Sequence, residues 1–149
     1  RGMSVFTVSD RVAMVLPIGL FLGRLSNFIN AELYGRVTDL PWGMVFPGSD
    51  GLPRHPSQLY EAGLEGLVLG GLMLFGYRRG WLAITGRLSS VLLIGYGSAR
   101  FLIEYVREPD PHLGTLLGLV TMGQLLCLPM IAGGVYILMR RRQTPGLPG

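Results

Sequence analysis

The stretch LGTLLGLVTMGQLLCLPMIAGGVYILM, residues 113–139, contains no charged side chain. It exceeds the ~20 apolar residues with which an α-helix crosses the hydrocarbon core of a bilayer. We therefore expect a transmembrane helix over about residues 115–139. Elsewhere in the chain, too, apolar residues come in long blocks and do not alternate with polar ones. Lipid suits such blocks better than a single water-facing core does.

Three other segments are long enough to cross a membrane only if they tolerate internal charge. They cover about residues 11–33, with Arg24 and Glu32, about 57–78, with Glu61 and Glu65, and about 86–107, with Arg100 and Glu104. Together with the uncharged run they predict an all-α integral membrane protein. Its residues 1–149 form a single transmembrane helical region with four helices and an outward-facing, Pro- and Gly-rich loop over about 34–56.

Composition agrees with a membrane location and excludes several classes of function. Hydrophobic residues make up 49% of the chain and charged residues only 15%, against ~25% in soluble domains. The net charge of +4 comes with no basic run interleaved with aromatics, so we expect no nucleic-acid partner. The sequence has no nucleophile-elbow motif, no phosphate-binding glycine loop and no metal-ligand spacing, so we expect no cofactor and no metal.

The arginines divide unequally between the two sides of this arrangement. The eight on the side of the chain ends are Arg1, Arg11, Arg78, Arg79, Arg87, Arg140, Arg141 and Arg142, and the three on the other side are Arg36, Arg54 and Arg107. Because cytoplasmic loops are enriched in Lys and Arg, both ends of this chain are predicted to be cytoplasmic. The loop over 34–56 and the turn over 107–114 then face outward.

Two arginines lie deep within predicted spans. Arg24 is thirteen residues beyond Arg11, and Arg100 is thirteen beyond Arg87, which places each about 20 Å along its helix at 1.5 Å per residue. Both therefore reach the outer half of the membrane. A charge at the bilayer centre costs ~2.5–3.5 kcal/mol, so such charges are retained mainly where they pair, face water or function.

Polar side chains share one face on each of these two helices. The residues of each face recur every three or four positions. They are Arg24, Asn27, Phe28 and Ala31 on the first helix, and Tyr96, Arg100, Glu104 and Arg107 on the third. Glu32 is displaced to one side. Two facing guanidiniums suit bidentate contacts with phosphate oxygens. The alternative is internal pairing of Arg24 with Glu32 or Glu104, and of Arg100 with Glu104; the carboxylates can also hold the arginines for a phosphate.

The second span begins with the segment LPRHPSQLYE, residues 52–61. Pro56 suits the first turn of a helix, and Gln58, Tyr60 and Glu61 then lie near its outer end. Such residues more often cap and anchor a helix than do chemistry. His55 is a further candidate for a catalytic base, but a loop histidine before proline is weak evidence for that role. In the preceding loop, Trp42 and Phe46 suit the headgroup level.

Three blocks of the sequence resemble one known family. GRLSNFINAELYGRVT (23–38), FPGSDGLPRHPSQLYEAGLEG (46–66) and GYGSARFLIEYVREPD (95–110) match, in order and spacing, the bacterial prolipoprotein diacylglyceryl transferases. The resemblance implies a multi-pass inner-membrane enzyme with seven transmembrane helices. It implies transfer of the diacylglyceryl group of phosphatidylglycerol to the lipobox cysteine thiol of a prolipoprotein, with release of glycerol phosphate. The implied partners are phosphatidylglycerol, the lipobox peptide and membrane lipids.

The resemblance also implies roles for particular residues. Arg24, Asn27, Glu32 and Gly35 match the signature block and are expected to bind phosphatidylglycerol. The residues expected to act in catalysis are Arg100, Glu104 and Tyr96. Arginine cannot accept the thiol proton, so its implied role is to bind the phosphodiester and to stabilise the departing phosphate. Tyr96, Glu104 or a histidine outside this chain remain as alternative bases.

Two departures from the family pattern qualify this prediction. Ser26 stands where the family has Gly or Ala, and the family is about twice as long, with a His-Gly-Gly motif in an N-terminal half that this sequence lacks. The chain resembles the last four of seven helices. Two alternatives are therefore an inactive C-terminal fragment that needs a partner half, and a segment of a polytopic transporter. A transporter would need polar residues along the whole membrane depth, whereas the cytoplasmic halves of these spans are nearly apolar.

Overall fold

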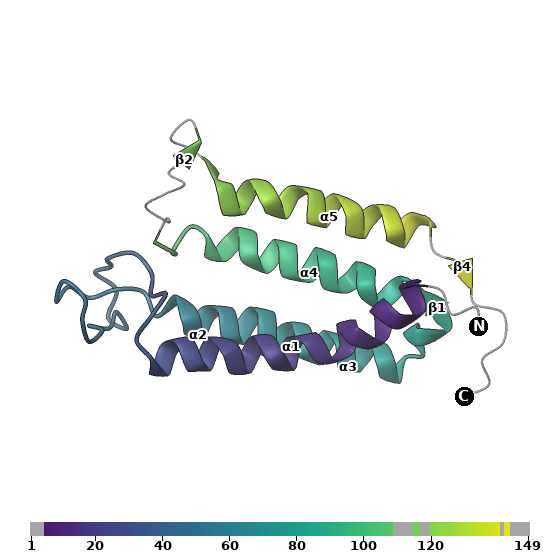
Figure 1. The fold of residues 1–149 in the computed structure, drawn as a ribbon, viewed down its shortest axis with the longest axis horizontal. Coiled ribbons are helices and arrows are strands. Elements are labelled where there is room, and N and C mark those ends of the chain that lie inside the picture. The colour runs from purple at the N-terminus through teal and green to yellow at the C-terminus, as the bar shows by residue number, and fades with distance from the viewer. Residues whose placement is uncertain (1–4, 109–114, 117–119, 141, 144–149) are drawn as a thin grey trace.

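The computed structural model describes residues 5–108, 115–116, 120–140 and 142–143. The predicted positions of Arg1 and Arg141, and most of the predicted turn over 107–114, lie outside these residues. The described chain is mostly helical, and its long helices run side by side (Figure 1). They are α1 (Val5–Ile29), a second continuous stretch made of α2 (Ser57–Glu61), the π-helix η1 (Ala62–Val68) and α3 (Leu69–Arg78), then α4 (Arg87–Ile103) and α5 (Met122–Arg140).

Successive long helices run in opposite directions, so α1 and α4 point the same way (Figure 1). Short elements lie at the helix ends: the 3-10 helix η2 (Trp81–Ala83), and the strands β1 (Ile84–Thr85), β2 (Thr115–Leu116), β3 (Val120–Thr121) and β4 (Arg142–Gln143). β1 pairs with β4 and β2 with β3, both antiparallel. The start of α1 lies at the same end as β4, and the loop over residues 30–56 lies at the opposite end (Figure 1).

Three helical stretches in the described residues are long and apolar enough to cross a membrane: Val5–Ile29, Ser57–Arg78 and Met122–Arg140. The helix α4, of 17 residues, is shorter than these. Large apolar side chains such as Ile18, Leu67 and Leu126 are about 60% exposed, while Glu61 and Glu65 are buried. Apolar residues outside and charged residues inside are typical of a protein in lipid, as the sequence predicts.

The first helix differs from its predicted bounds of 11–33. It begins at Val5 and ends at Ile29, so Glu32 lies beyond it. Ala31 and Leu33 have φ angles of 54° and 58°, in the left-handed region that ends an α-helix. Side chains from α2 hold this turn, since Ser57 Oγ donates to the Leu33 carbonyl (3.1 Å) and Gln58 Nε2 donates to the Glu32 carbonyl (2.8 Å).

The last two helices are also shorter than predicted. The helix α5 begins at Met122, not near 115, and the residue before it is Thr121. The Gln124 N–H donates to Thr121 Oγ1, and the Thr121 N–H donates to Gln124 Oε1, each at 3.2 Å. This reciprocal pair is a capping box, which fixes the helix start. The helix α4 was predicted over 86–107 but ends at Ile103, so Arg107 follows it.

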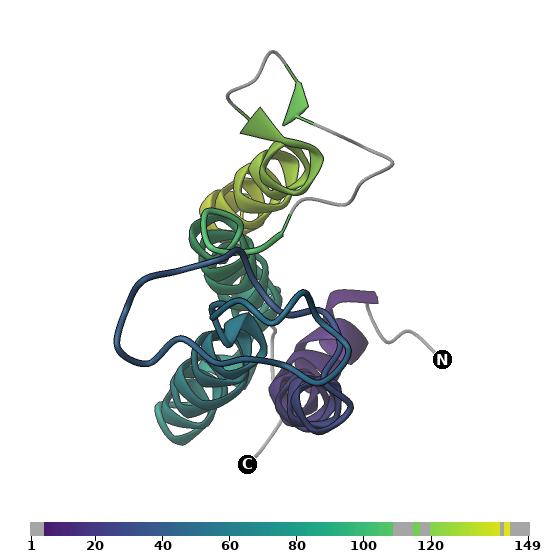
Figure 2. The same ribbon diagram turned by 90° about the vertical axis from the view of Figure 1, so that its left-hand side faces the viewer.

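Small residues allow the helices to approach closely. The Cα of Gly66 lies against Phe21, which joins the second span to α1, and the Cα of Gly97 lies against Ile131, which joins α4 to α5. In the end-on view α5 packs beside α4 and lies away from α1 (Figure 2). The loop after α1 crosses in front of the ends of α1 and the second span in the same view. The helix ends beneath this loop carry the polar cluster described next.

Candidate functional site

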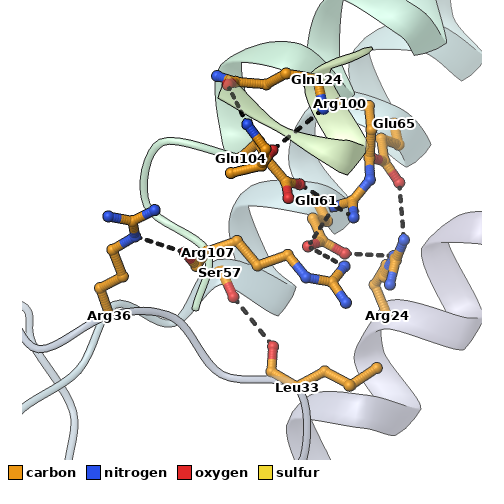
Figure 3. A network of polar contacts seen from close by, with 11 residues as sticks. Arg24, Leu33, Arg36, Ser57, Glu61, Glu65, Arg100, Glu104, Arg107 and Gln124 are labelled. Atoms are coloured by element: carbon orange, nitrogen blue, oxygen red, sulfur yellow. Dashed lines mark hydrogen bonds and ion pairs between the residues drawn. The ribbon is translucent and has the colours of Figure 1, made fainter. Parts of the chain in front are cut away.

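Three arginines from different parts of the chain converge on one carboxylate, that of Glu61 in α2 (Figure 3). Arg24 Nε of α1 lies 2.6 Å from Glu61 Oε2. Arg100 Nη1 of α4 lies 3.5 Å from Glu61 Oε1, and Arg107 Nη1 lies 3.7 Å from the same oxygen. Glu61 thus joins α1, the second span and α4 at one level of the bundle.

Two further carboxylates complete the cluster. Glu65 Oε2, in the π-helix, lies 3.5 Å from Arg24 Nη2, and Glu104 Oε2, directly after α4, lies 3.2 Å from Arg100 Nη2. The cluster therefore contains three arginines and three glutamates, and their formal charges cancel. Removing a charge from water costs several kcal/mol unless it is paired, so this balance explains how the glutamates are held inside an apolar bundle.

The carboxylates and the guanidiniums differ in exposure. The side chains of Glu61 and Glu65 are 2% and 0% exposed, whereas those of Arg24, Arg100 and Arg107 are 15–17% exposed. The glutamates are thus enclosed, and each arginine retains an accessible edge. A guanidinium has five N–H donors in a planar fork, so an arginine held on one edge by a glutamate can still donate to an anion on another.

The predicted ion pairs are partly confirmed. Arg100 pairs with Glu104, as expected. The prediction that Arg24 pairs with Glu32 or Glu104 is wrong, because its partners are Glu61 and Glu65. Glu32 lies in the turn after α1, is exposed, and accepts a hydrogen bond from Asn30 Nδ2 at 3.2 Å.

Two other predicted site residues, Asn27 and Tyr96, lie on the helices that carry Arg24 and Arg100. Asn27 is one turn beyond Arg24 on α1 and half-buried. Tyr96 is one turn before Arg100 on α4 and packs against the apolar core around Leu88 and Met73. Their positions agree with the predicted shared faces of the two helices.

Glu61 and Glu65 were missed as site residues. The prediction assigned Glu61 to helix capping, but its side chain is the centre of the cluster. A signal was present in the sequence: two acids four residues apart in an otherwise apolar span lie on the same side of a helix. Because an isolated carboxylate is costly in lipid, such a pair indicates cationic partners on neighbouring helices.

Gly35 has a packing role that the sequence did not reveal. It lies beside Arg107 in an isolated antiparallel bridge, and its N–H donates to the His55 carbonyl at 2.9 Å. A Cβ at this position would collide with the Val106 carbonyl oxygen and would lie 2.8 Å from His55 Cβ. Only glycine lets the outer loop approach the end of α4 this closely.

We expect Gly35→Ala to destabilise the protein by about 1–3 kcal/mol, the usual cost of inserting an extra carbon into a packed site. Thermal unfolding in detergent measures the change. The matched control is Gly63→Ala in the second span, where a Cβ meets nothing within 4 Å. Equal melting temperatures for the Gly35 variant and the wild-type protein would contradict the close approach.

The carboxyl group of Glu104 lies against the first turn of α5. A Cβ on Gly123 would lie 2.7 Å from Glu104 Cδ and 2.8 Å from Oε2. The small size of Gly123 therefore leaves the space in which Glu104 meets Arg100. The start of α5, fixed by the capping box, thus supports one end of the cluster.

Gly123→Ala should displace the Glu104 carboxylate and weaken its pair with Arg100, with a loss of stability of about 1–3 kcal/mol. Gly133→Ala, on the same helix but with nothing within 4 Å of the added Cβ, should leave stability unchanged or slightly raise it. Thermal unfolding of both variants is the test. An unfolding temperature for Gly123→Ala that equals that of Gly133→Ala would show that Glu104 does not occupy this space.

A second arginine centre, around Arg54, holds the outer loop. Arg54 Nη2 lies 2.8 Å from Asp50 Oδ2, and its Nη1 lies 2.6 Å from Glu108 Oε2 and donates to the Gly35 carbonyl at 3.2 Å. The guanidinium also lies over the Tyr34 ring, 5.2 Å from its centroid. The hydrogen bond from Arg54 holds the pKa of Asp50 below its usual value. These contacts tie the loop to the chain just after α4.

Aromatic residues of the same loop differ from one another in position. Trp42 is exposed and its Nε1 donates to Tyr60 Oη at 2.8 Å, while His55 Nδ1 lies 3.2 Å from the same hydroxyl. Phe46, predicted together with Trp42 at the headgroup level, is buried and stacks on Tyr34. The loop therefore has a small packed core of its own.

The fold and the cluster define a class: a helical membrane protein in which partly exposed arginines and buried glutamates of separate helices meet near one end of the bundle. Sequence comparison specifies the family. The sequence model described as prolipoprotein diacylglyceryl transferase matches residues 1–140, and the chain belongs to this family.

Individual relatives agree over nearly the whole chain. The phosphatidylglycerol–prolipoprotein diacylglyceryl transferase of Methylocella silvestris is 53% identical over 148 residues, which cover 97% of this chain and 54% of the relative. Those of Bordetella avium and Paramagnetospirillum magneticum are 52% and 55% identical, covering 97% and 93% of this chain and 55% and 52% of the relatives. The chain thus spans about half the length of the curated relatives it matches.

Proposed function

We propose that this chain supplies the arginine-bearing part of an enzyme that transfers the diacylglyceryl group of phosphatidylglycerol to the lipobox cysteine of a prolipoprotein. The observation that carries the proposal is the convergence of Arg24, Arg100 and Arg107, each with an accessible edge, in a chain of this family. A lipid phosphodiester is an anion at the membrane surface, and guanidiniums bind such phosphates in a bidentate manner.

In the proposed reaction the cysteine sulfur forms a thioether bond with a glyceryl carbon of the lipid. The bond between that carbon and the phosphate oxygen breaks, and glycerol phosphate leaves with the electron pair. Arg24 and Arg100 would bind the phosphodiester and stabilise the negative charge that gathers on the leaving group. Glu61 holds both guanidiniums in place and cannot itself bind the anion.

The attacking group is the thiolate, and a free cysteine has a pKa of about 8.5. The thiol proton therefore needs an acceptor. The family resemblance implies Tyr96 or Glu104 of this chain as the base that accepts the proton. A histidine in the other half of the enzyme is the alternative base. Asn27, Glu32 and Gly35 complete the proposed lipid-binding block; Gly35 acts through the position of the loop, and Glu32 lies outside the ion-pair cluster.

We propose further that α4 is a fourth membrane span and that the complete enzyme has seven. The end of the bundle that carries the cluster and the loop over 30–56 would face outward, and the start of α1 and the end of α5 would lie at the cytoplasmic side of the bacterial inner membrane. The unequal division of the arginines supports this orientation. Phosphatidylglycerol would then reach the cluster from the outer leaflet.

The second candidate is an inactive half that works only together with a partner half. The length of the curated relatives favours it, since this chain covers 52–56% of those compared. In that case the arginine cluster would still bind the lipid, but transfer would need residues supplied by the partner.

One assay distinguishes these proposals. The 149-residue chain and the full-length protein are reconstituted separately in vesicles with and without phosphatidylglycerol, and a lipobox cysteine peptide is added. Mass spectrometry of the peptide detects the added diacylglyceryl group. We expect transfer by the full-length protein only, and only with phosphatidylglycerol present. Absence of transfer by the full-length protein would refute the function, and transfer by the short chain alone would refute the need for a partner half.

A further inference from the structure

A buried carboxylate at the opposite end of the bundle, that of Asp10 in α1, binds the beginning of α4. Asp10 is 1% exposed. Its Oδ2 accepts the Gly86 N–H at 2.6 Å, and its Oδ1 accepts the Ser89 N–H at 2.7 Å and the Ser89 hydroxyl at 2.6 Å. The Ser9 hydroxyl lies 2.8 Å from the same Ser89 hydroxyl. None of these residues belongs to the arginine cluster.

This contact replaces a cap that α4 lacks. The residue before the helix is Gly86, which has φ 83° and offers no side-chain cap. The first N–H groups of a helix have no partner within it, and its positive end favours a carboxylate. Asp10 meets both needs from a different helix, because α1 passes beside the start of α4.

The first part of α1 leans toward α4 (Figure 1), and Pro17 lies inside this helix. Proline removes a backbone hydrogen bond inside a helix and clashes with the preceding turn, which bends the helix. The bend brings Asp10 to the start of α4.

The spacing along the two helices links Asp10 to the arginine cluster. Arg24 lies 14 residues beyond Asp10, and Arg100 lies 14 residues beyond Gly86. Each distance is about 21 Å along a helix at 1.5 Å per residue. Because α1 and α4 point the same way, joining Asp10 to Gly86 places Arg24 and Arg100 at the same level, where both reach Glu61.

We propose that Asp10 is a positioning residue that sets the depth of α4 relative to α1, and so aligns Arg24 with Arg100. In lipid, apolar helix faces have no hydrophobic driving force that favours one axial position, since lipid tails are as apolar as the side chains. A polar contact at a fixed point supplies that preference. The effect of Asp10 on diacylglyceryl transfer rests on the proposed function. Its effect on the alignment of α1 and α4 does not.

The test uses full-length protein carrying Asp10→Ala, Asp10→Asn or Ser9→Ala. Spin labels at Ile29 and Leu102, which are exposed near the cluster ends of α1 and α4, report the alignment as a distance distribution in proteoliposomes. We expect Asp10→Ala to shift or broaden this distribution, Asp10→Asn to do so less because it keeps one oxygen acceptor, and Ser9→Ala to leave it unchanged. Asp10→Asn serves as the test if Asp10→Ala fails to fold.

Kinetics of the unlabelled variants give the second measurement. Misaligned arginines should raise the KM for phosphatidylglycerol at least threefold and leave the KM for the peptide unchanged. A loss of folded protein would lower only the apparent kcat. An unchanged distance distribution in both Asp10 variants, or an equal change in Ser9→Ala, would overturn the proposal. Inactivity of the wild-type protein would refute the proposed function, while the label distances would still decide the alignment.

Discussion

Arg100→Ala and Arg24→Ala, each in the full-length protein, are expected to abolish diacylglyceryl transfer or lower it by about 10²–10³-fold, the usual effect of removing one donor that stabilises transition-state charge. Each change removes a guanidinium that lies against Glu61 and keeps an accessible edge. It also leaves one glutamate of the cluster without its counter-charge. Transfer to a lipobox peptide in phosphatidylglycerol vesicles measures the effect.

Two further variants separate charge from geometry. Arg100→Lys keeps the positive charge but loses the planar fork, so it should recover only part of the activity. Arg78→Ala removes an exposed arginine at the other end of the second span and should leave transfer unchanged. Normal turnover in both Arg24→Ala and Arg100→Ala would refute the role given to the arginines.

Glu61→Ala is expected to destabilise the protein by about 3–5 kcal/mol, the range for breaking a buried ion pair from one side. Glu61 is the shared partner of three arginines, and its side chain is 2% exposed. Without it the guanidiniums lose the carboxylate that joins α1 to α4. Thermal unfolding in detergent and the transfer assay should both show the loss.

Glu61→Gln keeps the shape of the side chain and removes its charge, so it should fold better than Glu61→Ala but remain impaired in transfer. The matched control is Asp39→Asn, which neutralises an exposed carboxylate of the outer loop and should change neither property. If Glu61→Gln had both the stability and the turnover of the wild-type protein, Glu61 would not be the centre of the site.

Local sequence signals were sufficient for some features and insufficient for others. The pair between Arg100 and Glu104 followed from their i, i+4 spacing. The start of α5 was missed because the uncharged run extends to both sides of Met122. Hydropathy alone gives no boundary inside such a run.

The end of α1 was missed for a different reason. The residues up to Leu33 include no glycine or proline after Gly23 that would stop a helix. The stop comes from left-handed backbone at Ala31 and Leu33, conformations that cost energy in non-glycine residues. Bonds from Ser57 and Gln58, more than twenty residues later, hold that turn. A contact so distant in sequence is invisible to a local pattern.

Composition and the helical period were enough to predict a helical membrane protein and to assign Arg24 and Arg100 to two of its helices. Both are local properties of the sequence. The partners of Arg24, which are Glu61 and Glu65 and not Glu32, depended on the tertiary structure. The choice among carboxylates depends on which helices are neighbours and how they align along their axes. That alignment is fixed by contacts such as the one between Asp10 and Gly86, which join residues 76 positions apart.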